Sequence, residues 1–179
     1  TGGHDPAGPS AQDALIEIAR DLFAKADLPP EIEALWWPRL ETMVAGYLAW
    51  ERERHGNVAS RAAEIAGGLD FAEIETRLTA RADRIDRLSD GSYAIVDYKT
   101  GGPPSKKMVE EGFALQLGTL GLLLAEGAYA DRGIEGEPTR FEYWSLGRDA
   151  KSDTGFGYVT TPLKVGPART GTLPGDFLP

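Results

Sequence analysis

The stretch TARADRIDRLSDGSYAIVDYKTG, residues 79–101, decides the fold, because its pattern predicts two β-strands joined by a tight turn. The first strand is expected over 74–88 and the second over 93–98, which is β-branched and flanked by glycine. Between them, Gly91 suits the left-handed position of a three-residue loop that pairs Leu88 with Ser92. The sequence therefore predicts an antiparallel hairpin.

This hairpin sets two carboxylates against each other. Counting outward from the loop, Ile85 faces Ile95 and Asp83 faces Asp97. Directly opposed side chains have Cβ atoms about 5 Å apart, and two like charges at that distance repel by about 3 kcal/mol at an effective dielectric constant of 20. Either a shared proton or a divalent cation must offset this repulsion. Because side chains alternate along a strand, Lys99 is expected on the same side as Asp97.

The pair of Asp97 and Lys99 alone is equally compatible with a structural ion pair at the end of a sheet. Two further residues favour a polar site instead. Glu64 lies upstream, and Gln116 lies in an apolar stretch where a buried amide must find a hydrogen-bond partner. A cluster of acids and a lysine would supply that partner.

The rest of the chain predicts helices around this hairpin. Ser10 is expected to cap a helix that begins there, and Trp36, on the next helix along the chain, is expected to pack in a hydrophobic core. Apolar spacing predicts three helices, at 10–29, 31–56 and 108–127. Two further short strands are predicted, at 139–146 and 156–161.

The composition limits the classes of function. With 28 acidic and 19 basic residues, the net charge of −9 argues against a cationic clamp that binds DNA by neutralising phosphates, although DNA held through a metal or a partner stays possible. No cysteine is present, so disulfides, thiolate zinc sites and iron–sulfur clusters are not expected, and a cytoplasmic location is expected. No apolar run is long enough to span a bilayer. Because the chain begins at Thr1, we expect a fragment of a longer protein.

Four features occur in an order that resembles a known family. Glu64 is followed by TARADRID (79–86), AIVDYKTG (94–101) and GFALQL (112–117), and this order resembles the PD-(D/E)xK nucleases of RecB type. With WWPRLE (36–41) and FEYWSL (141–146), the string is similar to the C-terminal nuclease domains of the AddB family in their alphaproteobacterial form. The resemblance implies a restriction-endonuclease-like α/β fold, with a mixed central sheet flanked by helices.

The resemblance also implies a metal centre. Asp83 and Asp97 would ligate Mg²⁺, with Mn²⁺ as a substitute, and the backbone carbonyl of Tyr98 would be a further ligand. Glu64 would take the position of an upstream acid on a helix and contact the metal through water. Phosphodiester hydrolysis uses such a cation to activate water and to neutralise charge in the transition state.

Two more residues acquire roles from the resemblance. Lys99 would orient the attacking water and stabilise charge on the phosphate, and Gln116 would hold this lysine or the DNA. Leu120 stands where the family often carries a tyrosine four residues after the glutamine, so a contact through a phenol is not expected.

The function expected from these observations is Mg²⁺-dependent cleavage of DNA, as the exonuclease module of a helicase–nuclease that processes double-strand ends. DNA, as single strands or duplex ends, and an AddA-type subunit are the expected partners, and no membrane is expected. The alternative is a catalytically silent nuclease fold that serves as a DNA-binding or assembly scaffold. The expected domains are a tail with the first helix, a nuclease core and a C-terminal tail, at 1–30, 31–165 and 166–179.

Overall fold

The computed structural model describes residues 8–146 and 157–164. These residues divide into two compact units, one formed by 8–56 with 145–146 and 157–158, and the other by 57–144 with 159–164. Helices dominate the first unit, whereas the second carries most of a five-stranded sheet. The candidate site lies in the second unit.

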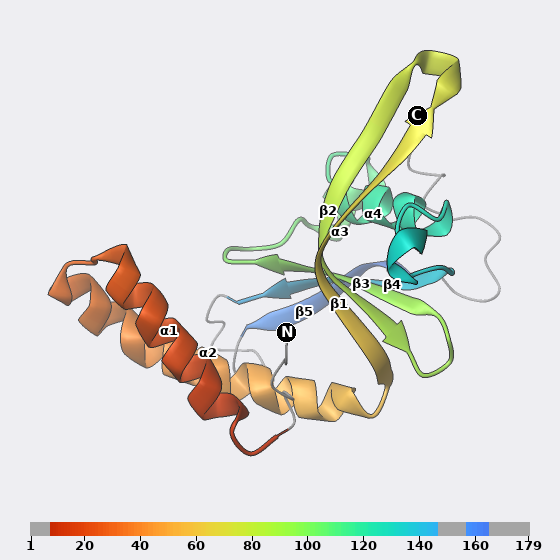
Figure 1. Ribbon diagram of the computed structural model, residues 1–179. Coiled ribbons are helices and arrows are strands. Elements are labelled where there is room, and N and C mark those ends of the chain that lie inside the picture. Colours follow the sequence, from red (N-terminus) through yellow and green to blue (C-terminus); the bar gives the residue numbers. More distant parts are fainter. Residues whose placement is uncertain (1–7, 147–156, 165–179) are drawn as a thin grey trace. The chain divides into compact units, whose positions relative to one another are not determined.

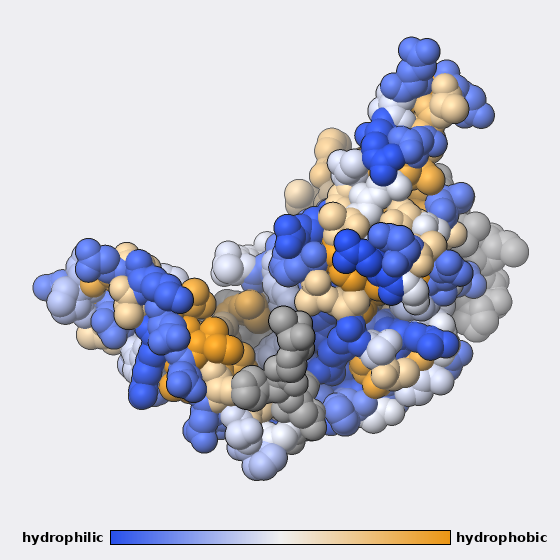
Figure 2. Space-filling view, in the orientation of Figure 1, coloured by the Kyte–Doolittle hydropathy of each residue, from blue (hydrophilic) through white to orange (hydrophobic). Residues whose placement is uncertain are grey.

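The helical unit contains α1 (Ala11–Ala26) and α2 (Pro30–His55), which confirms both predicted helices (Figure 1). Ser10 does not cap α1 as expected, because its backbone is not extended and its side chain makes no capping hydrogen bond. The expected core position of Trp36 is also wrong, since this side chain is 53% exposed. Figure 2 shows apolar side chains gathered on one side of these helices.

The sheet has the strand order β1-β2-β3-β4-β5. β1 pairs antiparallel with β2, β2 pairs antiparallel with β3, and β3 and β4 run in the same direction in Figure 1, so the sheet is mixed, as expected. The strands are β1 (Val58–Phe71), β2 (Thr76–Leu88), β3 (Tyr93–Lys99), β4 (Pro138–Ser145) and β5 (Tyr158–Lys164).

The structure confirms the predicted register of the central hairpin. The backbone N–H of Leu88 donates to the carbonyl of Ser92 at 2.8 Å, and Gly91 has φ +89° in the loop. Ile85 is the Cα partner of Ile95. The alternation of apolar residues and the turn chemistry are local, so they specify this pairing without help from the rest of the chain.

The first strand, β1, was missed by the sequence analysis. Its sequence VASRAAEIAGGLDF is rich in alanine and glycine, which have low strand propensity. It forms because it pairs with β2 almost throughout, out to Phe71 opposite Thr76. Beyond the last pairs to β3, these two strands continue as a two-stranded arm, which projects from the sheet in Figure 1.

The predicted helix over 108–127 is interrupted. The structure has α3 (Lys106–Glu110) and α4 (Gln116–Ala125), separated by a turn in which Gly112 has φ +78°. A residue at positive φ cannot continue a right-handed helix, so the turn makes Gln116 the first residue of α4 instead of a mid-helix residue. The next short element is the 3₁₀ helix η2 (Ala130–Arg132).

The core of this unit forms where α4 packs against the sheet. Leu117, Leu120 and Leu123 on the helix are buried with Ile85 and Ile95 on the strands. No helix within the described ranges is long and apolar enough to cross a membrane.

Candidate active site

Three of the predicted site residues form a closed cluster at the end of β3. The side-chain amide of Gln116 donates from Nε2 to Asp97 Oδ1 at 2.5 Å, and its Oε1 accepts from Lys99 Nζ at 2.8 Å. Lys99 Nζ also lies 2.5 Å from Asp97 Oδ2. The amide therefore bridges the carboxylate and the ammonium, and each of the three groups touches the other two. Gln116 finds its partners in the acid and the lysine, as predicted. Its expected burial is wrong, because it is exposed at the first position of α4.

Asp83 lies beside this cluster. The hairpin ladder ends at the pair of Arg84 and Val96, and Asp83 and Asp97 are the next residues along the two strands. Asp83 Oδ2 accepts a hydrogen bond from the backbone N–H of Tyr98 at 3.0 Å. This hydrogen bond holds the Asp83 carboxylate at the end of the strand, next to Asp97.

Asp97 is a buried charged group, with only 1% of its surface exposed. Burial raises the pKa of its carboxyl above the ordinary value, the adjacent Lys99 lowers this pKa, and the charge of Asp83 raises it again. Burial outweighs the lysine, so the site carries an electrostatic cost when Asp97 is ionised. A second cation near the carboxylates would reduce that cost.

Tyr143 on β4 is a neighbour of the cluster that the sequence analysis missed. It is fully buried, and its ring centroid lies 5.3 Å from Lys99 Nζ, within the range of a cation–π contact. Burial and then the charge of Asp97 raise the pKa of Tyr143 to about 12. The only signal in the sequence is the alternation of side chains along FEYWSL (141–146), which predicts the face of the strand on which Tyr143 lies. Alternation does not predict which strand lies next to β3.

Glu64 lies on β1, so the helix expected at this position is wrong. Its backbone has φ +56°, an unusual conformation for glutamate. On either side of it, Ala63 pairs with Arg84 and Ile65 pairs with Ala82. Glu64 therefore lies across from Asp83 in the ladder. Its exposed carboxylate pairs with Arg81 Nε at 2.8 Å and is not part of the cluster formed by Gln116.

Residues next to Asp83 and Asp97 on the two strands form a second polar group, because successive side chains of a strand point to opposite faces of the sheet. Arg84 binds Asp86 through two 2.7 Å contacts, donates to the hydroxyl of Tyr98 at 3.2 Å and lies 4.8 Å from the ring centroid of Trp144. Asp86 thus pairs with Arg84 and is not part of the cluster of Asp97, Lys99 and Gln116. These contacts tie together the strand ends that carry Asp83 and Asp97.

The donor set fits Mg²⁺ only in part. Within residues 8–146 and 157–164, no group of three or more histidine, cysteine, aspartate or glutamate side chains is arranged to hold a metal ion. Asp83 and Asp97 nevertheless supply two hard carboxylates, and Mg²⁺ commonly binds one or two carboxylates together with water and substrate phosphate. Asp83 and Asp97 therefore fit a cation whose other ligands come from water and substrate phosphate.

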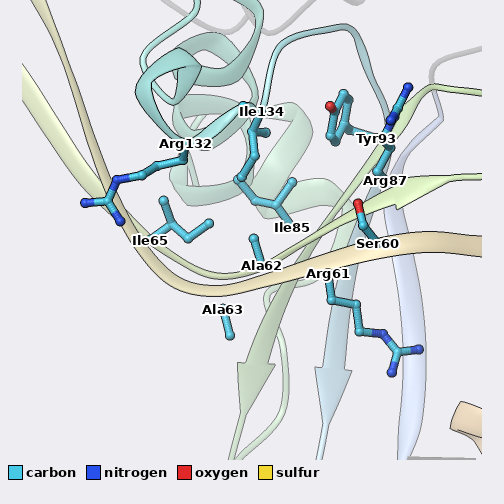
Figure 3. Close-up of a pocket in the computed structure, with 11 residues that line it drawn as sticks. Ser60, Arg61, Ala62, Ala63, Ile65, Ile85, Arg87, Tyr93, Arg132 and Ile134 are labelled. Atoms are coloured by element: carbon cyan, nitrogen blue, oxygen red, sulfur yellow. The ribbon is translucent and has the colours of Figure 1, made fainter. Parts of the chain in front are cut away.

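A hollow of about 440 Å³ lies elsewhere on the sheet (Figure 3). Ile65, Ile85 and Ile134 contribute apolar side chains to it, and Arg87 and Arg132 are among its other lining residues. It reaches Tyr93 at the start of β3, whereas the carboxylate cluster lies at the opposite end of that strand. None of the predicted site residues lines it.

A mixed sheet flanked by helices, with two aspartates and a lysine at the end of a central hairpin, defines a restriction-endonuclease-like α/β protein. The model of the PD-(D/E)XK nuclease superfamily matches residues 2–168, and the chain belongs to this superfamily.

Three relatives come from Rickettsia, and all are described as uncharacterized proteins. The chain is 30% identical to a protein of Rickettsia felis over 145 residues, which is 80% of the chain and 17% of the relative. It is 29% identical to a protein of Rickettsia typhi over 77% of the chain and 16% of the relative. It is also 29% identical to a protein of Rickettsia bellii over 66% of the chain and 14% of the relative. The chain thus spans about a sixth of the length of these relatives.

Proposed function

We propose that this chain is a Mg²⁺-dependent deoxyribonuclease that hydrolyses phosphodiester bonds. The observation that carries the proposal is the contact of Gln116 with both Asp97 and Lys99, with Asp83 beside them. An amide that binds both a carboxylate and an ammonium keeps opposite charges at fixed positions. Such preorganised charge is what stabilises a phosphoryl transition state.

Each residue of the cluster has a separate proposed role in the hydrolysis. Asp83 and Asp97 would hold the cation, which supplies charge neutralisation and a more acidic water when bound. Lys99 would bring its ammonium group to the phosphate, and its hydrogen bond to Gln116 fixes the direction of the side chain. Burial of Asp97 limits the water around its carboxylate and so strengthens its interactions with cations.

The wider role we propose is that of the nuclease module of an AddAB-type helicase–nuclease, which processes double-strand DNA ends for recombinational repair as an exonuclease. Two observations support it. The motif strings resemble those of the AddB family, and the relatives are about six times longer than the matching segment. A motor, a DNA track and an AddA-type partner would then lie on other parts of the complex, which accounts for a nuclease domain with a net charge of −9.

Cleavage of end-labelled single-stranded and duplex DNA tests the proposal. We expect cleavage with Mg²⁺ or Mn²⁺ and none with EDTA. Asp97→Asn and Lys99→Gln should each reduce the rate by about 100-fold or more, because each removes a group that stabilises developing charge. Glu73→Gln, at an exposed acid on the far end of the arm, is the matched control and should cleave like the wild type.

A catalytically silent scaffold is the second candidate, and one observation favours it. Lys99 Nζ lies 2.5 Å from Asp97 Oδ2, so the lysine already offsets part of the charge that a metal would neutralise. This candidate predicts DNA binding without cleavage under every metal condition. A third outcome, with neither metal affinity nor DNA binding, would reduce the cluster to a structural ion network.

A further inference from the structure

Phe113 is exposed in the turn that precedes Gln116 in the chain. Its side chain is 76% exposed, the largest value among the large hydrophobic residues that the structure describes. It lies in the turn between α3 and α4, three residues before Gln116. Gln116 in turn contacts both Asp97 and Lys99, so Phe113 is three positions along the chain from the amide that binds the proposed catalytic groups.

The backbone of this turn is held by several hydrogen bonds. The N–H of Phe113 donates to the carbonyl of Met108 at 2.9 Å, and the N–H of Gly112 donates to the carbonyl of Val109 at 3.1 Å. The Ser105 hydroxyl caps the start of α3 by accepting from the N–H of Met108 at 3.2 Å. Phe113 is therefore presented by a defined turn, and its ring is not folded back into the core.

Two lysines lie on α3, a few residues before Phe113 in the chain. Lys106 and Lys107 are exposed, and their ion pairs with Glu110 and Glu111 are surface pairs of 3.3 and 3.7 Å, which contribute little and leave the lysines available to phosphates. An exposed aromatic ring and exposed cations within one short segment are the combination that binds single-stranded nucleic acid, since bases stack on the ring and phosphates bind the charges.

We propose that Phe113 is a base-stacking platform for single-stranded DNA, adjacent to the site of cleavage. The inference rests on the proposed function, because the strand it holds is the proposed substrate. Stacking on Phe113 needs an unpaired base, so the subsite selects single strands or frayed duplex ends over intact duplex. It also fixes one nucleotide next to the residue that orients Lys99.

Equilibrium binding to a fluorescein-labelled oligothymidylate, measured by anisotropy without divalent ions and again with Ca²⁺, tests the platform. Phe113→Ala and Phe113→Leu should each weaken binding by about 5- to 150-fold, the range reported for loss of one stacked base. Phe113→Trp should retain or increase affinity, because it keeps an aromatic face. Ile74→Ala is the matched control, since Ile74 is 67% exposed at the far end of the arm, and it should bind like the wild type.

An oligonucleotide of the same length with abasic residues separates stacking from phosphate contacts. The wild type and Phe113→Ala should bind it equally, because it has phosphates but no bases. Equal affinity of Phe113→Ala and the wild type for the oligothymidylate, an undiminished affinity of Phe113→Leu, or no binding by the wild type would each overturn the proposal. The assay needs no cleavage, so a chain that binds through Phe113 but never cuts DNA would refute the proposed nuclease and leave the platform standing.

Discussion

Asp97 combines burial with charge, and its neighbours determine what that combination costs. The sequence predicts repulsion from Asp83, and the structure adds Lys99 and Gln116 as direct contacts. Burial still prevails and raises the pKa of Asp97. Folding therefore favours the neutral form of this residue, and the ionised form is retained at a cost in stability.

Replacement of Asp97 should change stability in a pH-dependent way. Below its ordinary pKa of 3.8, Asp97 is neutral in both the folded and unfolded states. As the pH rises through the higher folded pKa, the wild type loses free energy of unfolding and Asp97→Asn does not, so the melting temperature of the variant relative to the wild type should rise with pH. Differential scanning fluorimetry in EDTA from acidic to neutral pH measures this difference. A difference that falls with pH would contradict the raised pKa.

Metal should reverse that order at neutral pH. A ligand that binds only the folded state stabilises it in proportion to the logarithm of ligand concentration over the dissociation constant. Millimolar Mn²⁺ should therefore raise the melting temperature of the wild type more than that of Asp97→Asn. Equal shifts for both proteins would show that the cation binds elsewhere.

Tyr143 should report on the charge of Asp97. Its pKa is raised to about 12 by burial first and by the carboxylate second. In ¹³C-labelled tyrosine spectra, the Cζ resonance of Tyr143 should not shift as the pH passes the ordinary tyrosine value of 10. Asp97→Asn should lower its pKa while burial keeps it above 10, and Tyr143→Phe assigns the resonance. A wild-type midpoint near 10 would mean that the ring is accessible to water.

Close packing between elements explains why β1 contains glycine in the middle of a strand. A Cβ at position 67 would lie 2.9 Å from the carbonyl oxygen of Ala128, and closer still to the ring of Tyr129. Tyr129 is fully buried and belongs to the core of the sheet unit. Gly67 thus permits the segment after α4 to pack directly on the strand.

Gly67→Ala should destabilise the fold. The added methyl group meets backbone and a buried ring, so we expect a loss of about 1–3 kcal/mol from overpacking. Gly56→Ala is the control, because position 56 has φ −64° and no atom within 4 Å of an added Cβ. Chemical denaturation measures both variants. An equally stable Gly67→Ala variant would show that the segment at 128–129 can move away without cost.

The two units of the molecule have very different cores. Among the residues that the structure describes, the hydrophobic cluster of the sheet unit has 14 buried residues, whereas that of the helical unit has three, namely Ala11, Val44 and Leu48. Ile18, Leu22 and Leu35 of the helical unit are each more than half exposed. The sheet unit therefore holds most of the buried apolar area, and with it most of the stability.

Hydrogen exchange should follow this difference. Amides of α1 and of 30–43 should exchange faster than those of β3, because local opening of the helices exposes little additional apolar surface. Mass spectrometry of peptides from both regions measures the rates at a fixed pH. Equal protection in the two regions would indicate a single cooperative unit and would contradict the prediction.

The sequence by itself determined the central hairpin, its register and the proximity of Asp83, Asp97 and Lys99. These features depend on alternation along two adjacent strands and on one loop, so interactions over about 20 residues specify them. The first two helices were predictable for the same reason, because apolar spacing is a local property. The sequence did not reveal β1, whose alanines and glycines become a strand through pairing with β2.

Only the tertiary structure decided which distant residues complete the site. Gln116 reaches Asp97 because a turn at Gly112 starts α4 there, and Tyr143 lies under Lys99 because β4 is placed next to β3 in the sheet. Strand order and helix interruption arise from burial of the whole core, so no local pattern encodes them. The carboxylates and the lysine are thus a property of the hairpin, whereas their orientation and burial are a property of the folded chain.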